Sequence, residues 1–198
     1  MKHTIIAFLL FSVLTTGCHS VTKSNPHDDE SLSAIKQHKT MIHYSKSDLA
    51  KIYNELTKTS FIDTPKKSKL IFKDMKVFGY ASPFSLNLFI NINKLNKYQW
   101  PKEAVIGLFA HELSHMVSYE RRSFFSRMLF VRYYPFSVAT KQRVEHEADR
   151  IAIERGYGSE LVQSRIYGFR SYDKKRVEKM KKVYYWPETL EKIISKKE

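Results

Sequence analysis

Hydrophobic positions recur with a helical period in several parts of the chain. In residues 47–57 (SDLAKIYNELT) the apolar side chains fall at i, i+3, i+4 and i+7, which predicts a helix with one buried face. Gly156 is a stop signal that predicts a helix over residues 140–155, and Ser159 is expected to cap another helix over residues 159–168. The chain is basic from Lys174 onward, and a short helix is expected after Pro187.

A two-residue period appears in the segment between the first predicted helix and the centre of the chain. Residues 86–93 (LNLFININ) alternate, so Leu88, Ile90 and Ile92 would share one face of a half-buried strand. Shorter β-rich runs lie between residues 69 and 80. Strands followed by helices predict an α+β fold, with a small, mainly antiparallel sheet.

The segment after the strands is expected to form the central helix of the fold. Pro101 and Glu103 are good start signals, and residues 101–118 are apolar nearly all round. A helix without a polar face is buried, so the polar side chains that it carries need a reason to be inside.

That reason is the sequence HELSH at residues 111–115. On a helix, positions i and i+4 share a face, so His111 and His115 can present two imidazoles to one ion. Glu112 lies about 100° around the helix, where its carboxylate can take a proton from a water molecule at an open coordination position. The alternative is a core helix with two ordinary hydrogen-bonded histidines.

A catalytic zinc site requires a third protein ligand, and the predicted helix 140–155 offers several. Glu147 falls on a stripe of alternating charge, which is typical of a solvated face. The opposite face combines Glu145 and Asp149 with small alanines that permit close packing. We therefore expect Glu145 to be the third ligand. Asp149 should not bind the metal itself but orient one of the residues that do. His146 is the second candidate ligand, and an exposed carboxylate face is the alternative.

The N-terminal residues predict export. Residues 5–14 are apolar but too few to span a membrane, so residues 1–17 are expected to be a signal peptide. Residues 15–18 (TTGC) resemble a bacterial lipoprotein box, in which Cys18 would be lipidated. An ordinary secretory signal with an incidental cysteine is the alternative. The polar residues 18–42 are then expected to be a flexible tether.

The composition of the chain limits the kinds of partner that it is expected to bind. The chain has 198 residues, one cysteine, 34 Lys plus Arg and 20 Asp plus Glu, so its formal charge is +14 and a disulfide scaffold is excluded. A basic protein has anionic partners, and an exported one meets phospholipid rather than the chromosome, so we expect no nucleic acid. Residues 121–136 interleave aromatic side chains with arginines, which is typical of a membrane interface or, equally, of a core-packing loop.

HELSH followed by Glu145-x-x-x-Asp149 resembles the gluzincin metallopeptidases, and most closely the HtpX-like and CAAX-prenyl-endopeptidase group. The resemblance covers roughly residues 69–155. It implies a zincin-like fold, one Zn²⁺ held by His111, His115 and Glu145, and Glu112 as the general base. It further implies that the strand before the active-site helix, here Leu88, Ile90 and Ile92, pairs with the substrate backbone.

Together these inferences predict a zinc endopeptidase of the bacterial cell envelope, facing the periplasm or the exterior. Its peptidase domain would occupy residues 43–198, end in a basic helical extension and act as a monomer on protein or peptide substrates. A metal-binding envelope lipoprotein that acts as a scaffold without turnover is the alternative. A nucleic-acid-associated protease is a further alternative, which cleavage of residues 1–17 from the mature protein would exclude. A deformylase-like hydrolase needs a cysteine ligand, and the one cysteine of the chain, Cys18, is expected to be lipidated.

Overall fold

Helix α3 (Lys102–Glu120) is the central element of the structure, a computed structural model that describes residues 42–197. Every residue from Gly107 to Tyr119 is buried, which confirms the predicted apolar helix. Its N-cap is Pro101, so the helix begins at Lys102, one position later than the sequence suggested. The expected signal peptide, Cys18 and nearly all of the expected tether lie outside the described residues.

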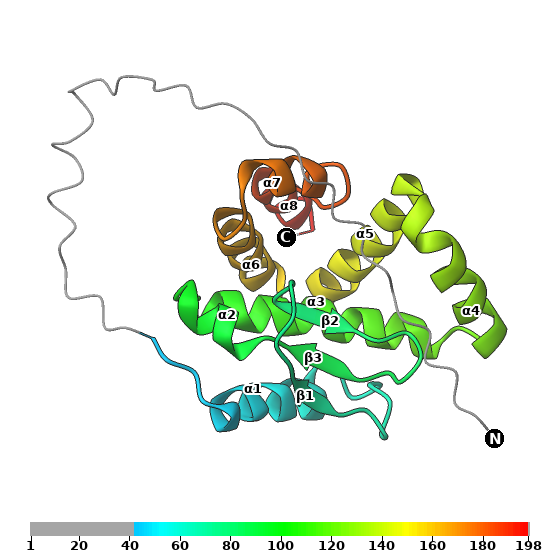
Figure 1. Cartoon of the computed structure of the whole chain (residues 1–198), viewed down its shortest axis with the longest axis horizontal. Coiled ribbons are helices and arrows are strands. Elements are labelled where there is room, and N and C mark those ends of the chain that lie inside the picture. The colour runs from blue at the N-terminus through cyan, green and yellow to red at the C-terminus, as the bar shows by residue number, and fades with distance from the viewer. Residues whose placement is uncertain (1–41, 198) are drawn as a thin grey trace, which may run out of the picture. The chain divides into compact units, whose positions relative to one another are not determined.

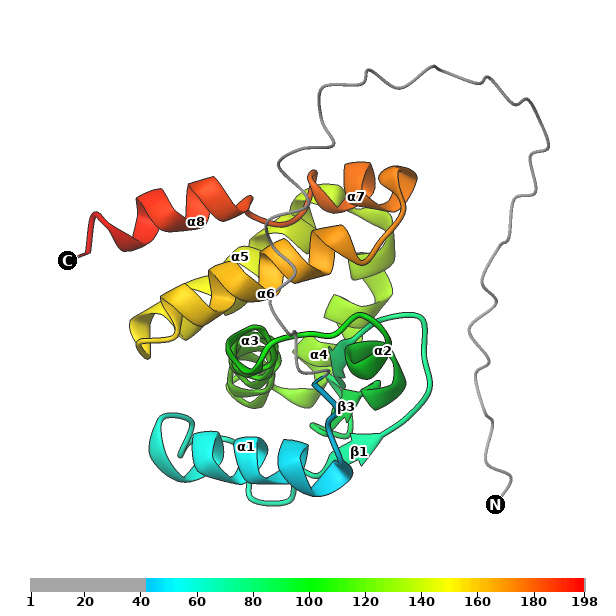
Figure 2. The same ribbon diagram turned by 90° about the vertical axis from the view of Figure 1, so that its left-hand side faces the viewer.

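Two layers cover α3 on opposite sides (Figures 1 and 2). Helix α1 (Lys46–Thr59) and the sheet lie on one side, and α5 (Val138–Glu154) and α6 (Gly158–Arg170) lie on the other. The three predicted helices at 47–57, 140–155 and 159–168 are thereby confirmed, each extended by a few residues. Gly156 follows α5 with φ of +87°, a conformation that favours glycine and ends the helix.

Four further helical elements lie in the second half of the chain. Helix α4 (Phe124–Tyr133) and the 3₁₀ turn η2 (Tyr134–Phe136) connect α3 to α5. Helix α7 (Lys174–Met180) follows α6, and the expected C-terminal helix is α8 (Pro187–Ile194), which packs on α6. Within the described part of the chain, no helix is both long enough and apolar enough to cross a membrane.

The sheet has three short strands, β1 (Leu70–Phe72), β2 (Gly79–Ala81) and β3 (Leu88–Ile90), in the order β1-β3-β2. Strand β3 pairs parallel with β1 and antiparallel with β2. The α+β class is confirmed, but the expectation of a mainly antiparallel sheet is wrong because the sheet is mixed. Strand β3 enters between its two predecessors, which places β2 at an edge.

The strand predicted over residues 86–93 is much shorter in the structure. It ends at Ile90 because the side chain of Asn91 accepts a hydrogen bond from the Lys94 amide and caps helix α2 (Ile92–Lys97). Ile92 therefore lies on a helix, where the two-residue alternation no longer applies. Leu88 and Ile90 remain on the strand and are fully buried.

Candidate metal centre

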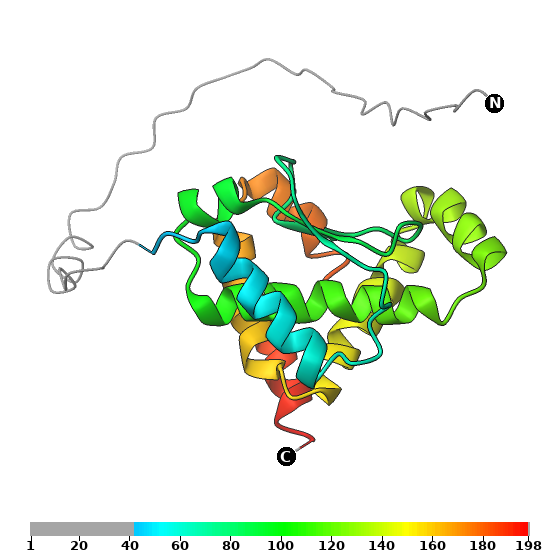
Figure 3. The same cartoon turned by 90° about the horizontal axis from the view of Figure 1, so that it is seen from below.

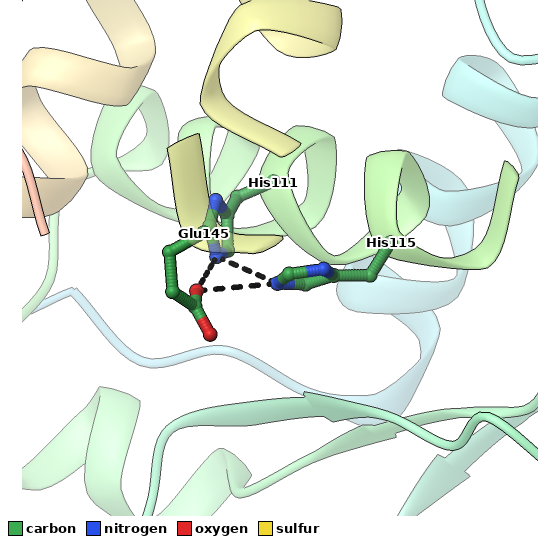
Figure 4. A group of neighbouring side chains, drawn as sticks. All are labelled: His111, His115 and Glu145. Carbon is green, nitrogen blue, oxygen red and sulfur yellow. Dashed lines mark hydrogen bonds and ion pairs between the residues drawn. The ribbon is translucent and has the colours of Figure 1, made fainter. Parts of the chain in front are cut away.

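Three side chains from two helices converge at the centre of the fold (Figure 4). His111 and His115 stand one turn apart on α3, and Glu145 faces them from α5. The Oε2 atom of Glu145 lies 3.0 Å from His111 Nε2 and 3.2 Å from His115 Nε2, and the two Nε2 atoms are 3.2 Å apart. Within residues 42–197 this is the one cluster of His, Cys, Asp and Glu with ligand atoms close enough to hold an ion.

The separations fit a metal ion. Tetrahedral zinc with ligand bonds of about 2.0–2.2 Å holds its ligand atoms about 3.3 Å apart. The three observed separations lie within 0.3 Å of this value. The side chains are buried, and three lone-pair donors that face one another away from water need a cation between them. The residues present therefore suit one divalent ion.

A buried ion pair fixes the orientation of His111. Its Nδ1 atom lies 2.8 Å from Asp149 Oδ1, and Arg165 of α6 donates to the same oxygen at 2.6 Å. Because Asp149 accepts a hydrogen bond from Nδ1, that nitrogen keeps its proton, and Nε2 is the nitrogen that gives up its proton to serve as a ligand. Burial and Arg165 lower the pKa of His111, but its bonds to Asp149 and Glu145 outweigh them and raise it to about 9.

Glu145 is held from its other side by Tyr134. The phenol of Tyr134 donates to Glu145 Oε1 at 2.7 Å, which leaves Oε2 to face the histidines. Burial would raise the pKa of the Glu145 carboxyl, but the neighbouring imidazoles hold it well below its usual range. The sequence analysis identified neither Tyr134 nor Arg165. A signal for Arg165 was its place on the buried face of a helix; Tyr134 offered none beyond its aromatic neighbours.

Glu112 is buried beside the cluster and faces strand β2. Its Oε2 atom accepts a hydrogen bond from the Ala81 amide at 2.8 Å. A Cβ atom at Gly79 would lie 3.1 Å from Glu112 Cγ, so the absence of a side chain there lets the strand approach the helix. Burial raises the pKa of the Glu112 carboxyl. A carboxylate with a raised pKa is suited to accept and return a proton near neutral pH.

Leu88, Ile90 and Ile92, which were expected to pair with a substrate backbone, lie on or directly after a strand that has no free edge. Strand β3 already pairs on both edges, so its backbone cannot add another strand. Strand β2 pairs on one edge only. At the two ends of β2, Phe78 O accepts a hydrogen bond from the Asn91 amide, and the Ser82 amide donates one to Asn87 O. The N–H and C=O groups of Gly79 and Ala81 therefore point to the outer edge, where the Ala81 amide donates to Glu112.

The remaining acidic and imidazole candidates on α5 lie away from the cluster. His146 stacks on Tyr185 with ring centroids 3.5 Å apart and does not contact the ligand atoms. Glu147 is half-buried and accepts hydrogen bonds from Ser118 and Arg122 at 2.9 Å. The face expected to be buried, with Glu145 and Asp149, is buried throughout.

A cavity of about 130 Å³ adjoins His111 and Glu112. Four aromatic residues, Phe78, Trp100, Tyr172 and Tyr184, contribute to its walls, and Arg165 and Arg176 also line it. The cavity lies beside the atoms that would hold the ion, so it can receive a group of a bound ligand.

Comparisons of the chain with protein-family models, with curated proteins and with solved structures find no match.

Proposed function

We propose that the protein is a zinc-dependent endopeptidase of the gluzincin type. The observation that carries this proposal is the convergence of His111 Nε2, His115 Nε2 and Glu145 Oε2 within 3.2 Å, with the buried carboxylate of Glu112 alongside. Two imidazoles and one carboxylate with an adjacent glutamate form a donor set typical of catalytic rather than structural zinc.

When bound, zinc supplies a Lewis acid that polarises a carbonyl and lowers the pKa of water toward about 7. Glu112 takes the proton of the attacking water on its carboxylate and later delivers it to the leaving amine. The Ala81 amide orients the Glu112 carboxylate for both transfers. Asp149 and Arg165 keep His111 in the tautomer that leaves Nε2 free.

The outer edge of β2 and the cavity supply the substrate contacts in this proposal. An extended peptide pairs with the outer N–H and C=O groups of Gly79 and with the C=O of Ala81, whose N–H is engaged by Glu112. This pairing aligns the scissile bond with Glu112. One of its side chains enters the aromatic cavity beside His111. Both features lie on the same side of α3 as Glu112, which supports a peptide rather than a small molecule as substrate.

Localisation is proposed from the N-terminal sequence alone. The apolar run at residues 5–14 and the box that ends at Cys18 support a lipid-anchored protein of the bacterial cell envelope. Its substrates are then proteins of the same compartment. Mass spectrometry of the mature N-terminus tests this; an unmodified Met1 in the protein isolated from its native membrane or medium would contradict it.

Activity against a denatured protein substrate, measured with zinc and after chelation, tests the proposed reaction. We expect turnover that a chelator abolishes and added zinc restores. Glu112→Gln should lose at least about 10²-fold in rate yet retain its zinc, since the general base is not a ligand. The half-buried Glu147→Gln is the control and should keep full activity.

Equal activity in Glu112→Gln and the unaltered protein would contradict the assigned base. Zinc binding without turnover on any denatured substrate would favour the non-catalytic metal-binding lipoprotein instead.

A further inference from the structure

Helix α4 turns its apolar face outward. Large hydrophobic side chains that are more than a third exposed are concentrated between residues 124 and 138. The docking face, as we define it, consists of Phe124, Phe125, Met128, Leu129, Tyr133 and Phe136. Phe125 is 75% exposed and Phe136 is 81% exposed, values at which burial in the core is excluded.

The arrangement follows from the helical period. At 100° per residue, the members of the docking face that belong to α4 fall within one half of the helix circumference. Phe130 and Tyr134 fall on the other half, where Phe130 is buried and Tyr134 reaches Glu145. The core-packing alternative for residues 121–136 therefore holds for these two side chains and not for the docking face.

The docking face extends beyond α4 and projects from the rest of the fold. The ring of Phe84, in the loop between β2 and β3, lies 6.4 Å from that of Phe124 and is half exposed. Figure 3 shows α4 extending away from α3, α5 and the sheet, with no described element over its outer side. An apolar surface of this extent on a soluble domain marks an interaction site.

The positive charge around the docking face favours one kind of partner over another. From residue 121 to residue 144 the chain carries six basic side chains and no acidic one. Arg132 lies at the middle of the docking face, is exposed, and forms no ion pair with any residue of the described part. A second copy of the chain would bring two such positive surfaces together, which is unfavourable. An anionic phospholipid surface offers both an apolar interior and negative headgroups.

We propose that α4 docks on the surface of an anionic phospholipid bilayer, with Phe125 and Leu129 inserted among the acyl chains and Arg132 at the headgroups. This inference does not depend on the proposed zinc chemistry, because neither the docking face nor its partner involves the metal ligands. Since α4 is followed directly by Tyr134, which donates a hydrogen bond to Glu145, docking would place the candidate metal centre close to the membrane surface.

Co-sedimentation with vesicles tests the proposal. The chain from residue 19 onward is used, because the described unit begins after residue 40 and is left intact. Vesicles are phosphatidylcholine alone or with about one third phosphatidylglycerol. The unaltered protein should bind the anionic vesicles, and Phe125→Ser with Leu129→Ser should weaken that binding at least about tenfold. Ile62→Ser, at a side chain 74% exposed outside the docking face, is the control and should bind normally.

The contribution of charge is tested separately. Arg132→Gln should weaken binding to anionic vesicles about fivefold and leave binding to neutral ones unchanged. Lys192→Gln, at an exposed lysine of α8, should change neither. Equal losses in the two variants would overturn the proposal, because they would indicate attraction by net charge alone.

A spectroscopic measurement on a different variant tests the proposal even if the serine variant fails to fold. Phe125→Trp should show a blue-shifted emission with anionic vesicles that is quenched by lipids brominated in their acyl chains. Absence of both effects, or a protein dimer that Phe125→Ser with Leu129→Ser dissociates, would overturn the proposal in favour of a protein–protein interface.

Discussion

The orientation of His111 is fixed by two buried residues. Asp149 accepts a hydrogen bond from His111 Nδ1 and is itself paired with the buried Arg165. Asp149→Asn keeps the shape of the side chain but removes the charge that fixes this tautomer. We expect zinc affinity to fall by about 10- to 100-fold. Competition with a chromophoric chelator measures it.

Glu154→Gln, on the exposed end of the same helix, is the matched control for that substitution and should bind zinc normally. Unchanged affinity in Asp149→Asn would mean that Asp149 does not orient the ligand.

The pH dependence of zinc binding follows from the same residue. In the metal-free fold the pKa of His111 is raised from 6.5 to about 9, so its proton contributes stability that is full below pH 6.5 and lost as the pH rises through 9. His111 can bind zinc only after it has lost the proton on Nε2. The affinity of the protein for zinc should therefore rise about tenfold per pH unit between pH 6.5 and pH 9. The increase in melting temperature on adding zinc should be larger at pH 8.5 than at pH 7; an equal or smaller increase would contradict this.

The three candidate ligands could be predicted from the sequence, but the residues that hold them in place could not. The spacing within HELSH and the split of residues 140–155 into charged and small faces identified the three side chains that converge. Tyr134 and Arg165 were not predicted because each reaches the cluster through tertiary contacts, from a 3₁₀ turn and from a third helix.

At the scale of elements, the close packing of α3 and α6 depends on Gly107. A Cβ atom there would lie 2.0 Å from the main-chain oxygen of Glu160. Because this oxygen belongs to the backbone of α6, no side-chain rotation could relieve the clash. Gly107→Ala should lower the free energy of unfolding by more than about 3 kcal/mol, measured by urea denaturation.

Gly156→Ala provides the comparison for Gly107→Ala. Nothing lies within 4 Å of its added Cβ, so only the strain of a positive φ remains, at about 1 kcal/mol. Equal losses in the two variants would contradict a steric role for Gly107.

The sheet shows where a sequence pattern stops determining an element. Alternation over residues 86–93 continues past the point where Asn91 caps a helix, and a two-residue period cannot register that cap. Which strand lies at the edge was likewise beyond the sequence, since it depends on β3 entering between β1 and β2. The free edge beside Glu112 therefore belongs to β2.

For the molecule as a whole, the central claim is that one divalent ion joins α3 to α5. Zinc bound per chain, measured by elemental analysis after dialysis, tests it most directly. We expect about one zinc in the unaltered protein and in Glu147→Gln, and a loss of it in Glu145→Ala. A zinc content in Glu145→Ala equal to that of the unaltered protein, or none in any of the three, would contradict the account.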